Sequence, residues 1–220
     1  MKSKSHILLI SCMIILSATI SSSGQNKYFN SAEEAIMQAK TDLMEILEQG
    51  TNFDFDIQME KLKEAEAAAT IPYQLVDFSS LLNTDSLQNF SELRNERLYY
   101  MVPLVVENEV VTVLQINKEE RGWIMGGLMS QNIRSSLNHI PVEVRKENMK
   151  PMRIYEVPNI HAVLYIVEKE QESMIFTDYK GMYTLKRPVE IEEIFSSLRR
   201  DALDFQQMHG DKLKDGKLVK

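Results

Sequence analysis

The stretch that decides the fold runs from Leu98 to Leu128 and reads LYYMVPLVVENEVVTVLQINKEERGWIMGGL. It contains three runs dominated by Val, Ile, Tyr and Thr, which are residues that favour strands. The runs are Leu98–Val106, Val110–Ile116 and Trp123–Leu128, separated by the polar segments ENE and NKEERG. Connections this short join antiparallel neighbours, so the stretch predicts a three-stranded meander.

A second β-rich block follows the charged connector EVRKENMK. Its expected strands are Arg153–Val157, Ala162–Glu168, Ser173–Tyr179 and Met182–Leu185. Both blocks contain Tyr-x-Val-Pro, at Tyr100 and at Tyr155, where the proline can begin a strand or lie at its edge. Two interpretations stay open, namely a helix-plus-meander unit repeated once, or a coincidence of two strand starts.

The clearest helix signal lies before the first block. In Ser31-Ala-Glu-Glu34 the serine side chain can bond the Glu34 amide while Glu34 reaches back, which is a capping box. Apolar residues then recur at helical spacing, and Gly50 stands where a left-handed residue ends a helix. Further helices are expected at 59–70, at 130–140 and from Pro188 to Gly210.

These patterns predict an α+β fold of antiparallel β-meanders with packed amphipathic helices, in two related halves if the repeat is real. The expected boundaries are a signal peptide at 1–24, a helix-plus-meander half at 25–139, a second meander with the C-terminal helix at 140–210, and a basic tail at 211–220.

The first 24 residues have the pattern of a secretory signal peptide. Lys2 and Lys4 precede a mostly apolar run from Ile7 to Ile20, and small residues follow. The run is short for a membrane span, although an uncleaved anchor stays open as an alternative. We therefore expect export to the periplasm or the cell surface, with no membrane insertion once the signal is removed.

The only cysteine, Cys12, lies inside this segment. Leu9-Ile10-Ser11-Cys12 resembles a lipoprotein box, in which the cysteine carries a lipid anchor. Only about five apolar residues precede Cys12, fewer than the roughly 7–15 of an ordinary signal, which favours an unmodified cysteine. A mature chain without Cys12 has no thiol, and this excludes disulfides, cysteine-bound zinc and a cysteine nucleophile.

The charge of the chain bears on its partners. Of 25 basic and 32 acidic residues, Lys2 and Lys4 leave with the signal, which moves the net charge from −7 to −9. An acidic surface disfavours nucleic acid and anionic lipid, so a protein partner is expected.

Local signatures of catalysis are missing from the sequence, which has no P-loop, G-x-G-x-x-G, G-x-S-x-G or H-E-x-x-H. We therefore assign no catalytic residue, metal ligand or cofactor. Asp54 and Asp56, in FDFD, would share one face of a strand and could bind calcium or act in acid-base chemistry. An ordinary half-buried strand is the alternative.

Four residues are candidates for binding. Tyr99 and Tyr100 alternate faces, so one of them should be partly exposed, and tyrosine is enriched at interfaces. Trp123 is the only tryptophan, and His161 stands at the start of a strand. In addition, Ser86 within Asp-Ser-Leu is similar to the Asp-Ser/Thr-apolar acceptor of O-glycans in some bacterial envelope proteins.

The helix Ser31–Gln49 followed by the meander Leu98–Leu128 resembles PepSY-like domains and the propeptide-type inhibitors of secreted proteases. The resemblance implies an amphipathic helix packed on an antiparallel sheet, and it transfers no functional residue.

The leading functional hypothesis is an exported, non-catalytic binding protein of the bacterial envelope or cell surface that inhibits or chaperones a secreted enzyme, with sheet edges that can accept a partner strand. One alternative is a secreted hydrolase that uses dispersed Asp, Glu and His, with Asp54 or Asp56 near His161. The other is a structural or assembly factor of the envelope.

Overall fold

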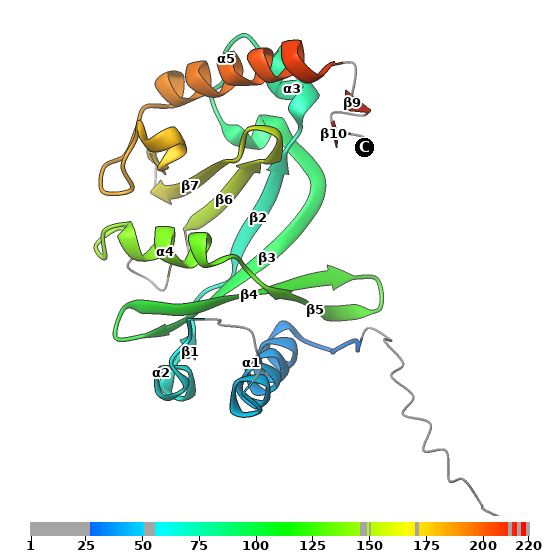
Figure 1. Ribbon diagram of the computed structural model, residues 1–220, viewed down its shortest axis with the longest axis vertical. Coiled ribbons are helices and arrows are strands. Elements are labelled where there is room, and N and C mark those ends of the chain that lie inside the picture. Colours follow the sequence, from blue (N-terminus) through cyan, green and yellow to red (C-terminus); the bar gives the residue numbers. More distant parts are fainter. Residues whose placement is uncertain are drawn as a thin grey trace, which may run out of the picture.

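The computed structural model describes residues 27–50, 56–145, 149, 151–169, 172–210, 213–214 and 217–218. Within these ranges the fold is α+β, as expected, with helices packed on one mostly antiparallel sheet (Figure 1). None of the helices in these ranges has the length and apolar character needed to cross a membrane. In the expected basic tail, β9 (Leu213–Lys214) pairs with β10 (Lys217–Leu218).

The main sheet has eight strands. They are β1 (Glu66–Ala67), β2 (Ile71–Val76), β3 (Arg94–Val106), β4 (Glu109–Glu119), β5 (Gly122–Leu128), β6 (Met152–Val157), β7 (Ala162–Lys169) and β8 (Glu172–Phe176). Their order is β5-β4-β3-β2-β6-β7-β8, and β1 also pairs with β3. Strands β3-β4-β5 are the meander expected from Leu98–Leu128, and β6-β7-β8 form the second. Because β2 and β6 pair in parallel, the two meanders form one continuous sheet.

The sheet curls around helix α4 (Gln131–His139), which lies on its concave face (Figure 1). The concave core joins Ile133 and Leu137 of α4 to side chains from β2, β3, β4, β6, β7 and β8. Side chains on the convex face are covered at the two ends of the sheet. There, α1 (Ala32–Glu48) and α2 (Met59–Glu64) pack on one end, and α3 (Phe78–Asn83) and α5 (Ile191–His209) pack on the other.

Helix α1 begins and ends as its sequence predicts. The Ser31 Oγ accepts a hydrogen bond from the Glu34 amide at 3.1 Å. The Glu34 carboxylate accepts from the Asn30 amide at 3.0 Å, one residue earlier than in a standard capping box. Gly50 follows the helix with φ 62°, the left-handed conformation that glycine adopts without strain.

The turn between β3 and β4 is a two-residue hairpin. Glu107 and Asn108 have φ values of 48° and 72°, as a type I′ turn requires. The guanidinium of Arg145, a buried residue, donates to the carbonyls of Asn108 and Ile140, both at 2.9 Å. This side chain therefore ties the turn to the segment that follows α4.

Two expected elements are wrong. The helix expected at 59–70 ends at Glu64, because Glu66–Ala67 pairs with β3 and the Ala68 amide donates to the Pro103 carbonyl at 2.8 Å. Backbone pairing at the sheet has overridden the helix propensity of the alanines. The strand expected at Met182–Leu185 is also missing, because the chain turns in the 3-10 helix η4 (Tyr179–Gly181).

The two Tyr-x-Val-Pro segments have different structural roles. Tyr100–Pro103 lies in the middle of β3, where the Pro103 carbonyl faces the break between β1 and β2. The Pro103 nitrogen also faces this break. Because no strand residue is paired there, the N–H that proline lacks is not needed for a hydrogen bond between strands. In contrast, Tyr155–Val157 ends β6, and Pro158 begins the 3-10 helix η3 (Pro158–Ile160). Neither segment begins a β block.

A buried carboxylate anchors η4 to α5. Asp201 is 8% exposed, and one of its oxygens accepts hydrogen bonds from the Tyr179 hydroxyl and the Lys180 ammonium, each at 2.8 Å. Burial alone raises the pKa of Asp201, but the hydrogen bonds from Lys180 and Tyr179 outweigh it, so the pKa lies below its ordinary value. The ionised Asp201 carboxylate therefore stabilises the folded state.

This carboxylate predicts a loss of stability in acid. A group whose pKa is lowered on folding contributes stability above its unfolded pKa, of about 4, and that contribution disappears as the pH falls through the folded pKa. Asp201→Asn should therefore cost about 1.5–3 kcal/mol at pH 7 and less at pH 3, as measured by urea unfolding. Asp204→Asn, an exposed carboxylate on the same helix, is the control. An equal loss for Asp201→Asn at both pH values would contradict the assignment.

Candidate functional site

Two of the four sequence-predicted binding residues meet at the edge of the sheet. Tyr100 on β3 and Trp123 on β5 have ring centroids 5.3 Å apart, with planes inclined at 58°. Both are half-buried and pack with α1 on the convex face. The other two lie elsewhere. Tyr99 packs edge-on against Tyr73 on the concave face, with centroids 6.0 Å apart.

His161 is exposed and has a φ of 53° after η3. Its neighbour Glu156 is half-buried, and burial raises the pKa of that carboxyl while the charge of His161 opposes the rise. The described residues contain no cluster of three or more His, Cys, Asp or Glu that could hold a metal ion.

The segment before α1 pairs with β5 at a single residue. The Phe29 amide donates to the Trp123 carbonyl at 2.8 Å, and the Trp123 amide donates to the Phe29 carbonyl at 2.9 Å. The turn into β5 allows this approach because Gly122 has φ 134° and no side chain; a Cβ there would lie 2.5 Å from the Phe29 carbonyl oxygen. Trp123 therefore shows that the outer edge of β5 accepts backbone pairing.

Beyond Trp123, the outer edge of β5 has no strand partner among the residues that the structure describes. Gly126, Gly127 and Leu128 are exposed, and Gly126 is the extra residue of a β-bulge opposite Gln115 and Ile116. An edge strand of this kind presents backbone donors and acceptors that another chain can pair with. We call the stretch Met125–Leu128 the open edge.

Cations surround the aromatic rings beside the open edge. The Lys118 ammonium lies 5.9 Å from the centroid of Trp123, and the Lys27 ammonium lies 5.1 Å from that of Phe29. Arg121 lies 5.8 Å from the ring of Tyr28, whose hydroxyl donates to Glu119 at 3.0 Å. That hydrogen bond raises the pKa of Tyr28. The rings thus keep their apolar bodies toward α1 and β5 while charged groups face water.

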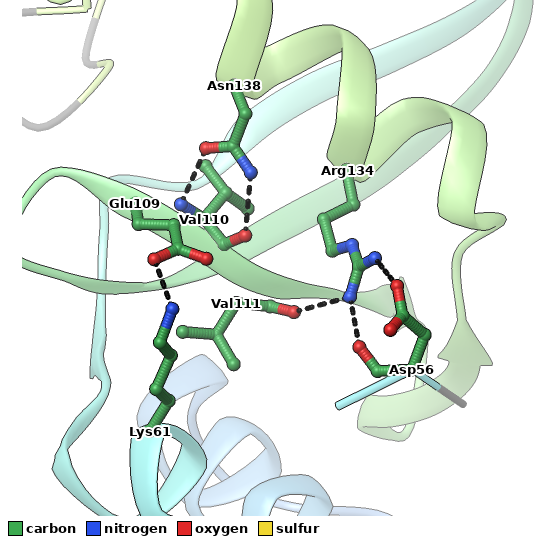
Figure 2. Close-up of polar contacts among 7 residues, drawn as sticks. All are labelled: Asp56, Lys61, Glu109, Val110, Val111, Arg134 and Asn138. Carbon is green, nitrogen blue, oxygen red and sulfur yellow. Dashed lines mark hydrogen bonds and ion pairs between the residues drawn. The ribbon is translucent and has the colours of Figure 1, made fainter. Parts of the chain in front are cut away.

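The part of β4 that extends past the end of β5, at Val110 and Val111, is closed by side chains from α4 (Figure 2). The Asn138 side chain accepts from the Val110 amide at 2.8 Å and donates to the Val110 carbonyl at 2.9 Å, as a paired strand would. Arg134 donates to the Val111 carbonyl at 3.4 Å. The sheet therefore covers this part of β4 with side chains, whereas Met125–Leu128 of β5 has no strand partner on its outer side in the part of the chain that the structure describes.

A polar pocket of about 230 Å³ lies along this closed edge, between α2, β4 and α4. Figure 2 shows an ion pair on either side of Val111. Lys61 pairs with Glu109 at 2.5 Å, and Arg134 pairs with the Asp56 carboxylate at 2.5 Å while also donating to the Asp56 carbonyl. Four ionisable groups of zero net charge thus line one pocket.

The structure places the remaining predicted residues apart from one another. Asp56 has φ 49°, so it does not continue a strand, and its pocket does not include His161. Ser86 is exposed in the loop after α3. Asp54 and Cys12 lie outside the described residues, as does the expected signal peptide.

Of the charged residues that line the polar pocket, sequence reasoning named only Asp56, and it gave Asp56 a different role. The Asp56–Arg134 and Lys61–Glu109 pairs join positions 78 and 48 apart in the chain, and neither has a local motif. One signal was available: Arg134 and Asn138 are four residues apart, so a helix at 130–140 places both on the same face. When compared with known protein families, curated proteins and solved structures, the chain matches none of them.

Proposed function

We propose that the chain is an exported, non-catalytic binding protein that pairs the open edge of β5 with an extended segment of a partner protein. The observation that carries the proposal is a difference between two neighbouring strands in how their outer backbone groups are covered. Asn138 closes β4, whereas among the described residues β5 has an outer backbone partner only at Trp123, and the stretch beyond it carries two glycines and the exposed Leu128. Natural sheets usually protect such edges, so an open one points to an occupant.

The geometry supports strand addition in particular. Backbone hydrogen bonds along an edge supply affinity, and pockets for alternate side chains supply specificity. On the convex side, the rings of Tyr100 and Trp123 pack beneath α1 and hold the strand in position. The sequence pattern of residues 1–24 supports export of the protein, and its partner would then be a protein of the envelope or cell surface, such as a secreted enzyme.

Leu128→Lys tests the docking edge, because a lysine on an edge strand discourages pairing. Leu203→Lys is the matched control, since Leu203 is an exposed leucine on α5, 46% exposed against 37% for Leu128. In cells of the native source, the wild type and the control should cross-link to the same partner. The Leu128→Lys variant should retain about one-tenth as much, which corresponds to roughly 1.4 kcal/mol.

Equal recovery of the partner by all three proteins would show that the open edge does not bind it. The export part of the proposal has its own measurement, which is intact mass after cell fractionation. A mature chain that begins near Gln25 is expected in the envelope or medium, and a full-length chain in the cytosol would contradict export.

A further inference from the structure

The polar pocket is held by backbone contacts that make it rigid. Asn138 binds both polar groups of Val110, and Arg134 donates to the carbonyls of Val111 and Asp56 (Figure 2). These contacts connect α4, β4 and the segment before α2, so the walls come from three parts of the fold. A site built on packed elements holds its polar groups in fixed positions without a ligand.

The size of the pocket limits its occupant. Pockets for drug-sized ligands run from roughly 300 to 1,000 Å³, and this one holds about 230 Å³. The two valines at its base, Val110 and Val111, are buried, so little apolar side-chain surface faces the pocket. The occupant is therefore a small, mainly polar molecule rather than an aromatic or lipid one.

The charges decide the chemistry of that molecule. Lys61 and Arg134 attract an anion, but Glu109 and Asp56 repel it. A simple cation is attracted by the two carboxylates and repelled by Lys61 and Arg134. A ligand with both signs gains from both pairs, with its carboxylate toward the cations and its ammonium toward the carboxylates. The Lys61 ammonium has three donors and Glu109 has two acceptor oxygens, and only one of each is used in their pair.

Exchange of the Lys61–Glu109 pair for ligand contacts costs little. The side chains of Lys61 and Glu109 are 38% and 50% exposed. An ion pair with this exposure contributes only about 0–1 kcal/mol to folding. This pair therefore holds its two charged groups in place without withholding them from a ligand. Arg134, in contrast, is only 20% exposed and donates to two carbonyls as well as to the Asp56 carboxylate.

We propose that this pocket binds a small zwitterion of the size of a free amino acid. The inference is independent of strand docking at β5, since it uses other residues. Titration calorimetry with each of the twenty standard amino acids provides the first test. At least one should bind, and the amide and the N-acetyl derivative of that amino acid, each lacking one of the two backbone charges, should bind at least tenfold more weakly.

The variants Lys61→Gln and Glu109→Gln should each weaken binding of the same amino acid about tenfold. Lys63→Gln is the matched control, since Lys63 lies on the same helix and pairs with Glu48 outside the pocket. Thermal unfolding of each variant verifies that the fold is intact. Three results would each overturn the proposal: no amino acid binds, the N-acetyl derivative binds equally well, or Lys63→Gln weakens binding as much as Lys61→Gln.

Discussion

Replacing Leu137 with alanine is expected to lower the free energy of unfolding by about 2–5 kcal/mol, the range for a buried leucine whose cavity collapses only in part. Leu137 is 0% exposed and lies on α4, inside the curve of the sheet. The core cluster to which it belongs includes side chains from most of the strands, among them Met101 and Val113. Because these strands are hydrogen-bonded to one another, they cannot move independently to fill the space.

Denaturant unfolding measures this loss, and thermal unfolding should show a lower midpoint, at about 2–4 °C for each kcal/mol in a chain of this size. Leu203→Ala removes the same atoms from an exposed helix position and should change stability by less than about 0.5 kcal/mol. If both variants lost the same stability, α4 would not be the enclosed centre of the concave core. Because α4 also carries Arg134 and Asn138, Leu137→Ala should in addition weaken ligand binding in the polar pocket.

Replacing Gly122 with alanine should cost about 2–6 kcal/mol and release the Phe29 segment from β5. Two effects combine. A φ of 134° is strained for any residue with a Cβ, which costs of order 1–3 kcal/mol. The new Cβ would also displace the Phe29 carbonyl 2.5 Å away, breaking two backbone hydrogen bonds with Trp123 worth about 0.5–1.5 kcal/mol each.

Fluorescence can follow this release directly, because Trp123 is the only tryptophan in the chain. Its emission should shift to longer wavelength in Gly122→Ala before global unfolding. Gly50→Ala is the control, since Gly50 also has a positive φ, of 62°, but a Cβ there meets nothing within 4 Å. That control should show the strain alone, with unchanged emission. An emission shift of equal size in both variants would contradict the steric explanation.

The predicted strands and helices came from local signals, and the strongest of these were correct. The meander from Leu98 to Leu128 follows from three β-prone runs with short polar connections, which leave antiparallel pairing as the only practical arrangement. The capping box at Ser31 and the apolar spacing of Ile133 and Leu137 likewise fix helices from residues a few positions apart. Weak signals failed where backbone pairing competed, as at 66–67.

The functional sites could be predicted only in part. Tyr100 and Trp123 were singled out as aromatic residues on strands, and the pairing of β3 with β4 and of β4 with β5 brought them together. The contact of Phe29 with Trp123 at the outer edge of β5 joins positions far apart in the chain, and the sequence of the strand does not encode it. The polar pocket could not be predicted, because charged residues such as Arg134 and Lys61 have the pattern of ordinary surface residues. Only the fold brings their distant partners next to them.

By itself, the sequence determined the α+β class, the two meanders and the helices at Ser31 and Gln131, because each depends on periodicity, capping or turn chemistry within a few residues. Tertiary structure alone decided that the meanders join through parallel β2 and β6 and that the sheet encloses α4. It also decided which edge stays open. Those features arise when apolar faces and unpaired backbone groups far apart in the chain satisfy one another, and no local pattern encodes which distant segment will do so.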